Sequence, residues 1–425
     1  MKYFIKTYGC KLNHSDSSLM EFFLNKKYEK ASSELEADFV VINTCSVVDA
    51  TSSKILKEAR GLRDMGKIVI FGGCLPEAMK DECERVANGV LVPTNIDKIL
   101  SVVESAVNGN NISIFESTNV DKSLFLKNSK PQDSISGIVA ISEGCLGSCT
   151  YCVTRLARKK LISFDSKNII AQINNLLSSG FKEIQLTSQD LAVYGFDQGS
   201  QKLPQLLSDI NSLSGNFRVK LGMMNPGWAG KIIDDILIEL QGRNFYKFLH
   251  IPIQSGDNDL LLKMQRGYNI EDFKLIADKF RDRFSNSILS TDIIVGHPLE
   301  TDEMFFNTVK VLKEIRPEII HIFKFSKRPN TIDEKHKDLP DRIKKDRSRI
   351  ITKLFHEMNE ETNQGFIGKN EEVLVVERRA DSFISRTNSG RAVVLEKNGL
   401  KLGDFIKIRV IGSKWNYLVG EIVQD

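Results

Sequence analysis

The sequence predicts an α/β protein that has a parallel α/β domain at its N-terminus and a small all-β barrel at its C-terminus. Strand and helix patterns alternate along two separate stretches of the 425-residue chain, and that alternation favours parallel sheets. The last sixty residues change to short β-rich segments between glycine or polar turns, which is typical of a small barrel. Between the two ends, a six-strand series predicts an open, partial (β/α)6 barrel of the TIM type.

The N-terminal elements follow from hydrophobic patterning. A strand is expected at Lys2–Thr7, followed by a helix at Ser17–Lys27 with Ser15 or Asp16 as its N-cap. Asp38–Asn43 is a nearly continuous apolar run, as buried parallel strands are. A helix at Asp49–Met65 and a strand at Lys67–Phe71 complete the βαβα order.

The central series is predicted from apolar runs that are separated by helical patterns. Its strands are expected at Gly137–Ile141, Glu183–Thr187, Lys220–Met224, Phe248–Ile253, Leu289–Val295 and Ile319–Phe325. Helices are expected at Asn168–Leu177, Lys231–Leu240 and Asp302–Glu314, and a charged helix at Leu339–Glu361. The β-rich segments of the C-terminal barrel begin at Glu372, Ala392, Phe405 and Tyr417.

These patterns divide the chain into four predicted segments. Residues 1–107 form the N-terminal domain, and residues 108–136, which are polar and without period, form a linker. Residues 137–365 form the central domain, and residues 366–425 form the C-terminal barrel.

Composition sets limits on the function. Hydrophobic residues make up 41% and charged residues 27% of the chain, which is ordinary for a globular protein and excludes a wholly disordered one. No run of 18 apolar residues predicts a membrane span, and the N-terminus does not resemble a signal peptide, so we expect a cytoplasmic protein. The net charge of +4 permits nucleic-acid binding without requiring it. Seven cysteines, an odd and sparse number, favour metal ligation or catalysis over a disulfide framework.

The most informative motif is CLGSCTYC, which contains Cys145, Cys149 and Cys152. Three thiolates in one loop can hold one metal cluster, and the motif follows a strand of the central series, where such barrels place their chemistry. A 4Fe–4S cluster with three protein ligands leaves one iron open to an exogenous ligand. The alternatives are a zinc site that a distant residue completes, because structural zinc takes four ligands, and thiols without a metal.

A second set of cysteines follows the strands of the N-terminal domain. Cys10, Cys45 and Cys74 each come after a predicted strand, about one βα unit apart. Parallel strands end on the same edge of a sheet, so these thiols can converge there and hold a second cluster. The alternative is three buried structural thiols. Cys83 follows no strand, and we expect it not to be a ligand.

With Tyr151 before its last cysteine, the CxxxCxxC motif resembles that of the radical S-adenosylmethionine superfamily. In that superfamily the open iron binds S-adenosylmethionine, and one electron cleaves it to a 5′-deoxyadenosyl radical. Two three-cysteine sets in this order resemble the methylthiotransferases, and the match extends over the whole chain through motifs such as TYGCKLNHSDS, HIPIQSGD and TDIIVGHPLET. The C-terminal barrel resembles the TRAM module, an RNA-binding barrel of the OB type.

Within that family, TYGCKLNHSDS and GCLGSCTYCVTRLAR resemble the archaeal and eukaryotic branch. The resemblance implies methylthiolation of threonylcarbamoyladenosine at position 37, next to the anticodon of tRNA. It also implies two 4Fe–4S clusters, with sulfur delivered at the N-terminal one. This sequence departs from the family at Lys159, Leu299 and Asn330, where glycine is commoner, and at His297 and Lys327, where phenylalanine and proline are commoner.

Polar residues at the ends of the central strands are further candidates for cofactor binding. They are Tyr151, Ser188, Gln189, Asp190, Gln254, Ser255 and Asp292. Asp190 has an equally good alternative role as a helix N-cap. Gln254 and Ser255 are expected to face the mouth of the barrel. Asp292 opens an apolar strand and needs a partner if it is buried. His250 is expected to be a hydrogen-bonded barrel residue.

RNA contacts are expected from basic residues of the C-terminal barrel, namely Arg378, Arg379, Arg386, Arg391 and Lys414. Trp415 and Tyr417 can stack bases, but closing the barrel is the favoured role. The implied partners are a tRNA anticodon stem-loop, an electron donor and a sulfur source, and a monomer is expected. The competing functions are methylthiolation of isopentenyladenosine or of a ribosomal protein, and non-catalytic RNA binding by a zinc-stabilised protein.

Overall fold

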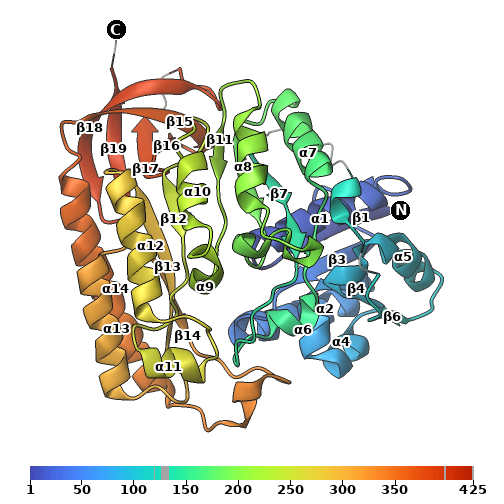
Figure 1. The fold of residues 1–425 in the computed structure, drawn as a ribbon. Helices are drawn as coiled ribbons and strands as arrows, with labels where there is room; N and C mark the ends of the chain where they lie inside the picture. The colour runs from blue at the N-terminus through green and yellow to red at the C-terminus, as the bar shows by residue number, and fades with distance from the viewer. Residues whose placement is uncertain (119, 126–133, 397–398, 424–425) are drawn as a thin grey trace. The chain divides into compact units, whose positions relative to one another are not determined.

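The computed structural model describes residues 1–118, 120–125, 134–396 and 399–423 (Figure 1). The chain forms two compact units, and each contains segments that are distant in sequence. The first consists of residues 1–128, 140–169 and 326–336, and the second of residues 129–139, 170–325 and 337–425. Both cysteine sets therefore belong to the first unit. None of the helices within the described ranges has the length and apolar character that a membrane span requires.

A six-stranded parallel sheet forms the centre of the first unit, in the order β2-β1-β3-β4-β5-β6. Its strands are β1 (Lys2–Thr7), β2 (Glu29–Lys30), β3 (Phe39–Thr44), β4 (Ile68–Gly73), β5 (Gly89–Leu91) and β6 (Ile112–Ile114). The associated helices are α1 (Lys11–Leu24), α2 (Asp49–Asp64), α3 (Leu75–Ala78), α4 (Lys80–Val86), the 3-10 helix η1 (Pro93–Lys98) and α5 (Ile99–Val107). The predicted parallel α/β domain is confirmed.

Both faces of this sheet are covered, which explains the continuous apolar run in β3. Val40 and Ile42 pack in a cluster with residues of α2 and α4, whereas Phe39 and Val41 pack in a second cluster with residues of α1 and α5. Every residue of β3 is buried. Side chains alternate between the two faces of a strand, so a strand buried on both faces has no position for a solvated residue.

The first helix begins earlier than predicted. Cys10 occupies the N-cap position and the helix starts at Lys11, so Ser15 and Asp16 lie inside it rather than at its cap. Asp16 is tolerated in a helix interior because its carboxylate contacts Lys122 at 2.9 Å and Arg158 at 2.6 Å. The sequence resembled a helix start because aspartate is common both at helix N-caps and in buried ion pairs, and the sequence does not distinguish the two.

The segment predicted as a linker is partly integrated into the first unit. Strand β6 pairs with β5, and the 3-10 helix η2 (Lys122–Leu124) contains the buried Lys122. Residues 119 and 126–133 of this segment lie outside the described residues. The first unit also contains β8 (Ser142–Glu143), α6 (Thr154–Arg158), β9 (Ile162–Ser163) and the 3-10 helix η5 (Ile332–Lys335).

The six predicted strands of the central series are present. They are β7 (Ser136–Ala140), β10 (Glu183–Thr187), β11 (Arg218–Lys220), β12 (Phe248–His250), β13 (Ile288–Val295) and β14 (Ile319–Lys324). They form two three-stranded sheets, β11-β10-β7 and β12-β13-β14, and parallel bridges from Val219 to Phe245 and from Met223 to His250 join them. β11 ends at Lys220 rather than at Met224, because beyond it only the bridge at Met223 continues the pairing.

Helices connect these strands as expected for a (β/α) series. They are α7 (Ser166–Ser178), α8 (Leu203–Asn211), α9 (Pro226–Ala229), α10 (Ile233–Glu239), α11 (Asn258–Lys263), α12 (Ile270–Arg283) and α13 (Asp302–Ile315), with the 3-10 helices η3 (Leu191–Val193) and η4 (Phe196–Gln198). The long helix α14 (Asp341–Gln364) precedes the C-terminal barrel (Figure 1).

The C-terminal strands form a closed five-stranded barrel in the order β15-β16-β17-β19-β18. They are β15 (Asn370–Arg378), β16 (Ser382–Thr387), β17 (Ala392–Glu396), β18 (Phe405–Lys414) and β19 (Tyr417–Ile422). The prediction missed β16, whose sequence SFISRT alternates polar residues with only two large apolar ones. Residues 397–398 and 424–425 of the predicted domain lie outside the described residues.

Candidate functional site

Three thiols converge at one edge of the N-terminal sheet. Strands β1, β3 and β4 are neighbours, and Cys10, Cys45 and Cys74 follow them at their carboxyl ends. The Asn13 Oδ1 atom lies 3.8 Å from the Cys10 sulfur and 4.0 Å from the Cys74 sulfur. A Cβ atom added to Gly9 would lie 3.2 Å from the Cys45 sulfur and 2.9 Å from Asn13 Nδ2. The predicted convergence is confirmed, since all three sulfurs lie around Gly9 and Asn13.

Two glycines make this close approach possible. Gly9 has a φ of +104°, and its added Cβ would also lie 3.0 Å from the Cys45 Cβ. Gly73 has a φ of +88°, and its Cβ would meet Asn43 Oδ1 and the Thr44 carbonyl oxygen at 2.4 Å. A side chain at either position would require a strained backbone and would fill the space between the strand ends. The glycines thus keep the thiol edge compact.

Burial makes Cys74 and Cys45 poor acids in the absence of a metal. It raises the pKa of Cys74 to about 12 and raises the pKa of Cys45 as well, while Arg158 acts in the opposite direction on Cys74. A metal cluster would displace the protons and stabilise the thiolates. Soft thiolate donors suit iron–sulfur clusters and zinc, so this donor set fits such a group. Cys83 is fully buried in the core cluster with Ile42 and Val86, away from the thiol edge.

The second thiol set lies in the loop between β8 and α6. A Cβ atom added to Gly147 would lie 3.3 Å from the Cys145 sulfur and 3.5 Å from the Cys149 sulfur, so these two sulfurs share one side of the loop. The Gly147 N–H donates to the Cys145 sulfur at 3.2 Å. Burial raises the pKa of Cys152, and the nearby Cys149 adds to this effect. Three sulfurs gathered in one loop again fit a thiolate-ligated cluster.

A hydrogen bond from outside the loop holds it in place. The Thr150 hydroxyl donates to Asp333 Oδ2 at 2.6 Å, and the Asp333 N–H donates to the Thr150 carbonyl at 3.2 Å.

The positions where the family commonly has glycine differ in their backbone conformation. Lys159, at the end of the helix that follows the loop, has a φ of 41° and forms an ion pair with Glu77 at 2.9 Å. Asn330 has a φ of 65°, whereas Leu299 does not have a positive φ. The backbone at Lys159 and Asn330 would therefore suit glycine, whereas the backbone at Leu299 does not require it.

Asp190 is the predicted helix cap, and it also keeps an unused oxygen. Its Oδ1 accepts from the backbone N–H groups of Ala192 and Asn225, both at 3.1 Å. Its Oδ2 is buried and has no hydrogen-bond partner among the described residues, and burial raises the pKa of Asp190 to about 7. The buried Ser188 hydroxyl likewise has no partner there. Buried polar groups that lack a partner within the protein are suited to a polar ligand.

Gln254 and Ser255 differ in what they can offer a ligand. Gln254 is 8% exposed and has a φ of 70°, a conformation that suggests a functional constraint in a residue other than glycine. Ser255 is completely buried, with its hydroxyl 3.4 Å from that of Thr308 and accepting from the Asp257 N–H at 3.2 Å. The expectation that Ser255 faces the barrel mouth is wrong, because its hydroxyl packs against helix α13.

The partner of Asp292 is a residue of the protein itself. His250 Nε2 lies 2.8 Å from Asp292 Oδ1, as expected for a hydrogen-bonded barrel histidine. His321 pairs in register with Asp292 on the next strand, and the two imidazole rings are 5.5 Å apart. Sequence reasoning missed His321. The register of β13 and β14 was the only signal that could have placed it beside Asp292.

Two of the five predicted RNA-contacting residues have partners within the protein. Arg391 is 7% exposed and donates to Asn363 Oδ1, so it is not available to RNA. Arg386 forms an ion pair with Glu183 at 3.1 Å. These partners lie on α14 and β10, outside the barrel, and the sequence of the barrel alone could not reveal them.

The other three candidates remain accessible. Arg378 and Lys414 are exposed, and Arg379 is exposed although it pairs with Glu377 at 2.9 Å. Trp415 stacks on His356 at 3.9 Å between ring centroids, so it packs the barrel against α14. This packing agrees with a structural role for the tryptophan.

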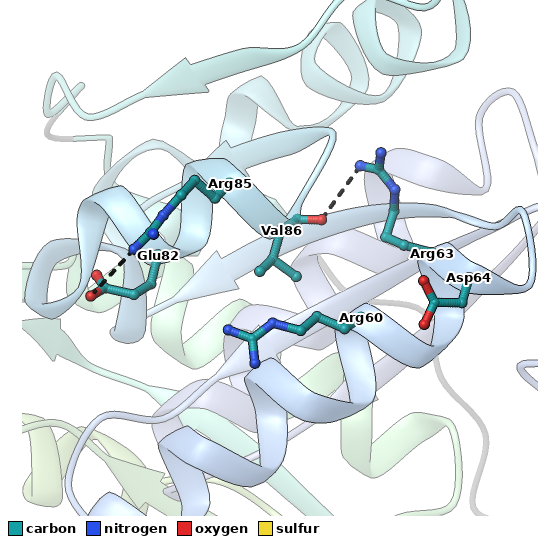
Figure 2. Close-up of a pocket in the computed structure, with 6 residues that line it drawn as sticks. All are labelled: Arg60, Arg63, Asp64, Glu82, Arg85 and Val86. Carbon is teal, nitrogen blue, oxygen red and sulfur yellow. Dashed lines mark hydrogen bonds and ion pairs between the residues drawn. The ribbon is translucent and has the colours of Figure 1, made fainter.

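A basic pocket lies at the C-terminal end of α2 and is separate from the thiols. It has a volume of about 320 Å³ and is lined by Arg60, Arg63, Asp64, Glu82, Arg85 and Val86. In Figure 2, Arg85 reaches toward Glu82 and Arg63 toward the Val86 carbonyl. Cys45 precedes the opposite end of this 16-residue helix, which is roughly 24 Å long, so the pocket is not part of the cysteine site.

Comparison with known proteins identifies the class. Residues 2–92 match Uncharacterized protein family UPF0004, residues 139–312 match the Radical SAM superfamily, and residues 364–423 match the TRAM domain. The chain is thus a radical S-adenosylmethionine enzyme with an additional N-terminal domain and a TRAM barrel. Membership of that superfamily implies S-adenosylmethionine and a 4Fe–4S cluster.

Full-length relatives define the family. The chain is 40% identical over 428 residues to a probable threonylcarbamoyladenosine tRNA methylthiotransferase of Archaeoglobus fulgidus, covering 100% of this chain and 99% of the relative. It is 28% identical to the threonylcarbamoyladenosine tRNA methylthiotransferase of Homo sapiens, covering 100% of this chain and 74% of the human protein. The chain belongs to the threonylcarbamoyladenosine tRNA methylthiotransferase family, as its cysteine motifs indicated.

The fold has solved counterparts. The radical S-adenosylmethionine methyltransferase TsrM from Kitasatospora setae, with cobalamin and a 4Fe–4S cluster bound, has a TM-score of 0.60 at 11% identity. The match covers 78% of this chain and 73% of that one. The cobalamin-dependent enzyme OxsB has a TM-score of 0.54 at 11% identity, with 78% and 54% coverage. At this identity the likeness shows the fold alone.

Proposed function

We propose that this enzyme converts threonylcarbamoyladenosine next to the anticodon of tRNA into its 2-methylthio derivative. The observation that carries the proposal is the presence of two three-thiol sets in one compact unit of a chain that matches a family member over 99% of that relative's length. A radical enzyme that only cleaves S-adenosylmethionine needs one such site. The second site provides a place from which sulfur can be delivered.

The two thiol sets would hold different clusters. Cys145, Cys149 and Cys152 would hold the 4Fe–4S cluster that is open to S-adenosylmethionine, and Cys10, Cys45 and Cys74 would hold an auxiliary 4Fe–4S cluster. When bound, these groups supply the radical and sulfur chemistry. The protein contributes thiolate ligands, glycines that allow close approach, and burial of Cys74, which limits access of water to that sulfur.

The polar groups of the central series would bind the cofactor. The Ser188 hydroxyl and Asp190 Oδ2 are buried and have no hydrogen-bond partner within the described part of the chain, and a cofactor amine or hydroxyl would satisfy them. Gln189, Gln254 and Tyr151 are proposed as further contacts. Asp292 would act together with His250, because the two side chains are hydrogen-bonded to each other.

The TRAM barrel would hold the anticodon stem-loop. Arg378, Arg379 and Lys414 are the proposed phosphate contacts, because their side chains are exposed. A base must leave its stack before an enzyme can act on it, so the barrel would hold the flanking RNA rather than the target base. The proposal includes an external electron donor, a sulfur source, a cytoplasmic site of action and a monomeric enzyme.

Single cysteine substitutions test the division of labour. Cys145→Ala should remove about half the iron and all cleavage of S-adenosylmethionine, because each cluster has its own three ligands. Cys45→Ala should retain cleavage but abolish methylthio transfer. Cys83→Ala is the matched control, since it changes a buried cysteine away from both sites and should change neither activity.

The readouts are iron and sulfide content, 5′-deoxyadenosine formation and mass spectrometry of nucleosides from the treated tRNA. A tRNA that carries isopentenyladenosine serves as the competing substrate. Normal product formation by Cys45→Ala would refute sulfur delivery from the N-terminal site. Methylthiolation of isopentenyladenosine in preference to threonylcarbamoyladenosine would refute the proposed substrate, and an iron-free, zinc-containing protein would refute catalysis.

A further inference from the structure

Four buried charges form a closed ring in the first unit. Lys122 Nζ lies 2.9 Å from Asp16 Oδ1 and 2.8 Å from Glu143 Oε2. The Arg158 guanidinium lies 2.6 Å from Asp16 Oδ2 and 2.6 Å from Glu143 Oε1. All four side chains are between 1% and 9% exposed. Two cations balance two carboxylates, so the ring leaves no net charge in the interior.

The members of this ring come from the segments that flank the two thiol sets. Asp16 lies in α1, which begins directly after Cys10. Glu143 stands two residues before Cys145, and Arg158 ends the helix that follows Cys152. The ring therefore fixes the loop of one thiol set to the helix that follows the other. Charged groups that are held in this way have defined positions relative to the sulfurs.

Arg158 alone among the four extends from the ring to the auxiliary thiols. Its Nη2 donates to Asn13 Oδ1 at 2.8 Å, the same oxygen that lies 3.8 Å from the Cys10 sulfur and 4.0 Å from the Cys74 sulfur. The Asn13 amide donates to the Tyr8 carbonyl at 2.8 Å, which fixes its orientation. The guanidinium and the two sulfurs thus lie around the same amide oxygen.

We infer that Arg158 is a positioning residue for the auxiliary cluster. Its guanidinium makes that cluster easier to reduce. The inference rests on the proposed function, because it requires a cluster at Cys10, Cys45 and Cys74. Reduction adds negative charge to a cluster, and a buried positive charge nearby stabilises the added electron more strongly than it would in water. Groups beyond the direct ligands commonly tune metal sites in this way.

A purely structural role for Arg158 makes a different prediction. The contacts to Asp16 and Glu143 would stabilise the fold whether or not a cluster were present, and their loss would lower the melting temperature alone. The contact to Asn13 places the charge beside the sulfurs, and its loss would change the reduction potential of the cluster. The potential therefore separates the two roles.

The experiment uses the full-length, anaerobically reconstituted protein with Cys149→Ala, which leaves only the auxiliary cluster. The midpoint potential is measured by redox titration with electron paramagnetic resonance. Arg158→Met should shift the potential to a more negative value, and Arg158→Lys, which keeps the charge, should give a smaller shift. The control is Arg347→Met, because Arg347 is 6% exposed and bound to Glu300 and Asp302, outside the first unit. It should lower thermal stability without shifting the potential.

A second variant keeps the test decisive if Arg158→Met folds poorly. Arg158→Met combined with Asp16→Asn removes one charge of each sign and leaves the Lys122–Glu143 pair in place. It should still shift the potential to a more negative value, but by less than the single variant, because loss of the Asp16 carboxylate acts in the opposite direction. An unchanged potential in a variant that lacks the guanidinium and retains full auxiliary iron would overturn the inference. An iron-free Cys149→Ala protein would instead contradict the auxiliary cluster itself, and with it the proposed function.

Discussion

Glu183→Gln should destabilise the second unit strongly, because Glu183 links the central series to the C-terminal barrel. The carboxylate is completely buried on β10 and accepts hydrogen bonds from Ser136 and from the Tyr246 hydroxyl, the latter at 2.8 Å. Arg386 of β16 contacts it at 3.1 Å. The substitution keeps the shape of the side chain but removes the charge that holds these donors together.

The magnitude follows from the burial of the two ion-pair partners. Breaking a fully buried ion pair costs about 3–5 kcal/mol, because the remaining charge stays uncompensated. Arg386 is 26% exposed and can turn partly toward water, so the cost of leaving it unpaired is smaller than for a fully buried partner. We therefore expect a loss of about 2–3 kcal/mol in the free energy of unfolding. For a unit of this size, each kcal/mol shifts the melting temperature by roughly 2–4 °C, so a decrease of roughly 4–12 °C is expected.

The pH dependence provides an independent check of the sign. Burial by itself would raise the pKa of Glu183, but Arg386 and the hydrogen bonds from Ser136, Gln185 and Tyr246 hold it below its usual value. The stabilisation is then complete above the unfolded pKa of about 4.3 and is lost as the pH falls through the lower folded pKa. The difference between wild type and variant should stay constant from pH 8 to about pH 5.5.

Scanning fluorimetry of the reconstituted full-length protein measures this effect. Glu361→Gln is the matched control, because Glu361 is 70% exposed and pairs with the 46% exposed Arg316. It should shift the melting temperature by less than about 2 °C, since exposed pairs contribute little. Equal shifts for the two variants would refute the reasoning, and so would a difference that disappears near neutral pH.

Three further outcomes are expected. Lys159→Gly should leave the melting temperature unchanged or raise it by roughly 2–4 °C. The reason is that relief of backbone strain of about 1–3 kcal/mol outweighs loss of the part-exposed ion pair with Glu77. A lower melting temperature would show that the ion pair contributes more than the strain. Arg391→Ala should lower the melting temperature, whereas Arg378→Ala should spare it but weaken tRNA binding and flatten its salt dependence, as binding at two salt concentrations would show. Asp190→Asn should be more stable than wild type at pH 8 and equally stable only below about pH 4, since a pKa raised to about 7 in the folded state costs wild-type stability as the pH rises from the unfolded pKa of about 3.9 toward 7; thermal melts across this range check it.

Local sequence patterns determined the parallel N-terminal sheet and its thiol edge. β3 was predicted within one residue because a strand buried on both faces leaves an uninterrupted apolar run. Cys10, Cys45 and Cys74 follow adjacent parallel strands, and the shared direction of those strands was sufficient to bring the thiols together. Each strand and the cysteine that follows it lie close together in the chain, so the local pattern of apolar residues and cysteines was enough to predict them.

The tertiary structure alone decided which charged residues are buried, and against what. Asp16 read as a helix cap and Lys122 as part of a linker, yet they form an ion pair across 106 positions of sequence. Arg391 read as an RNA contact but is buried against α14, and Arg158 was not singled out at all. The sequence around a charged residue is the same whether its side chain faces water or pairs with an opposite charge. Its burial becomes favourable only when a partner arrives from a distant segment, and only the folded chain supplies that partner.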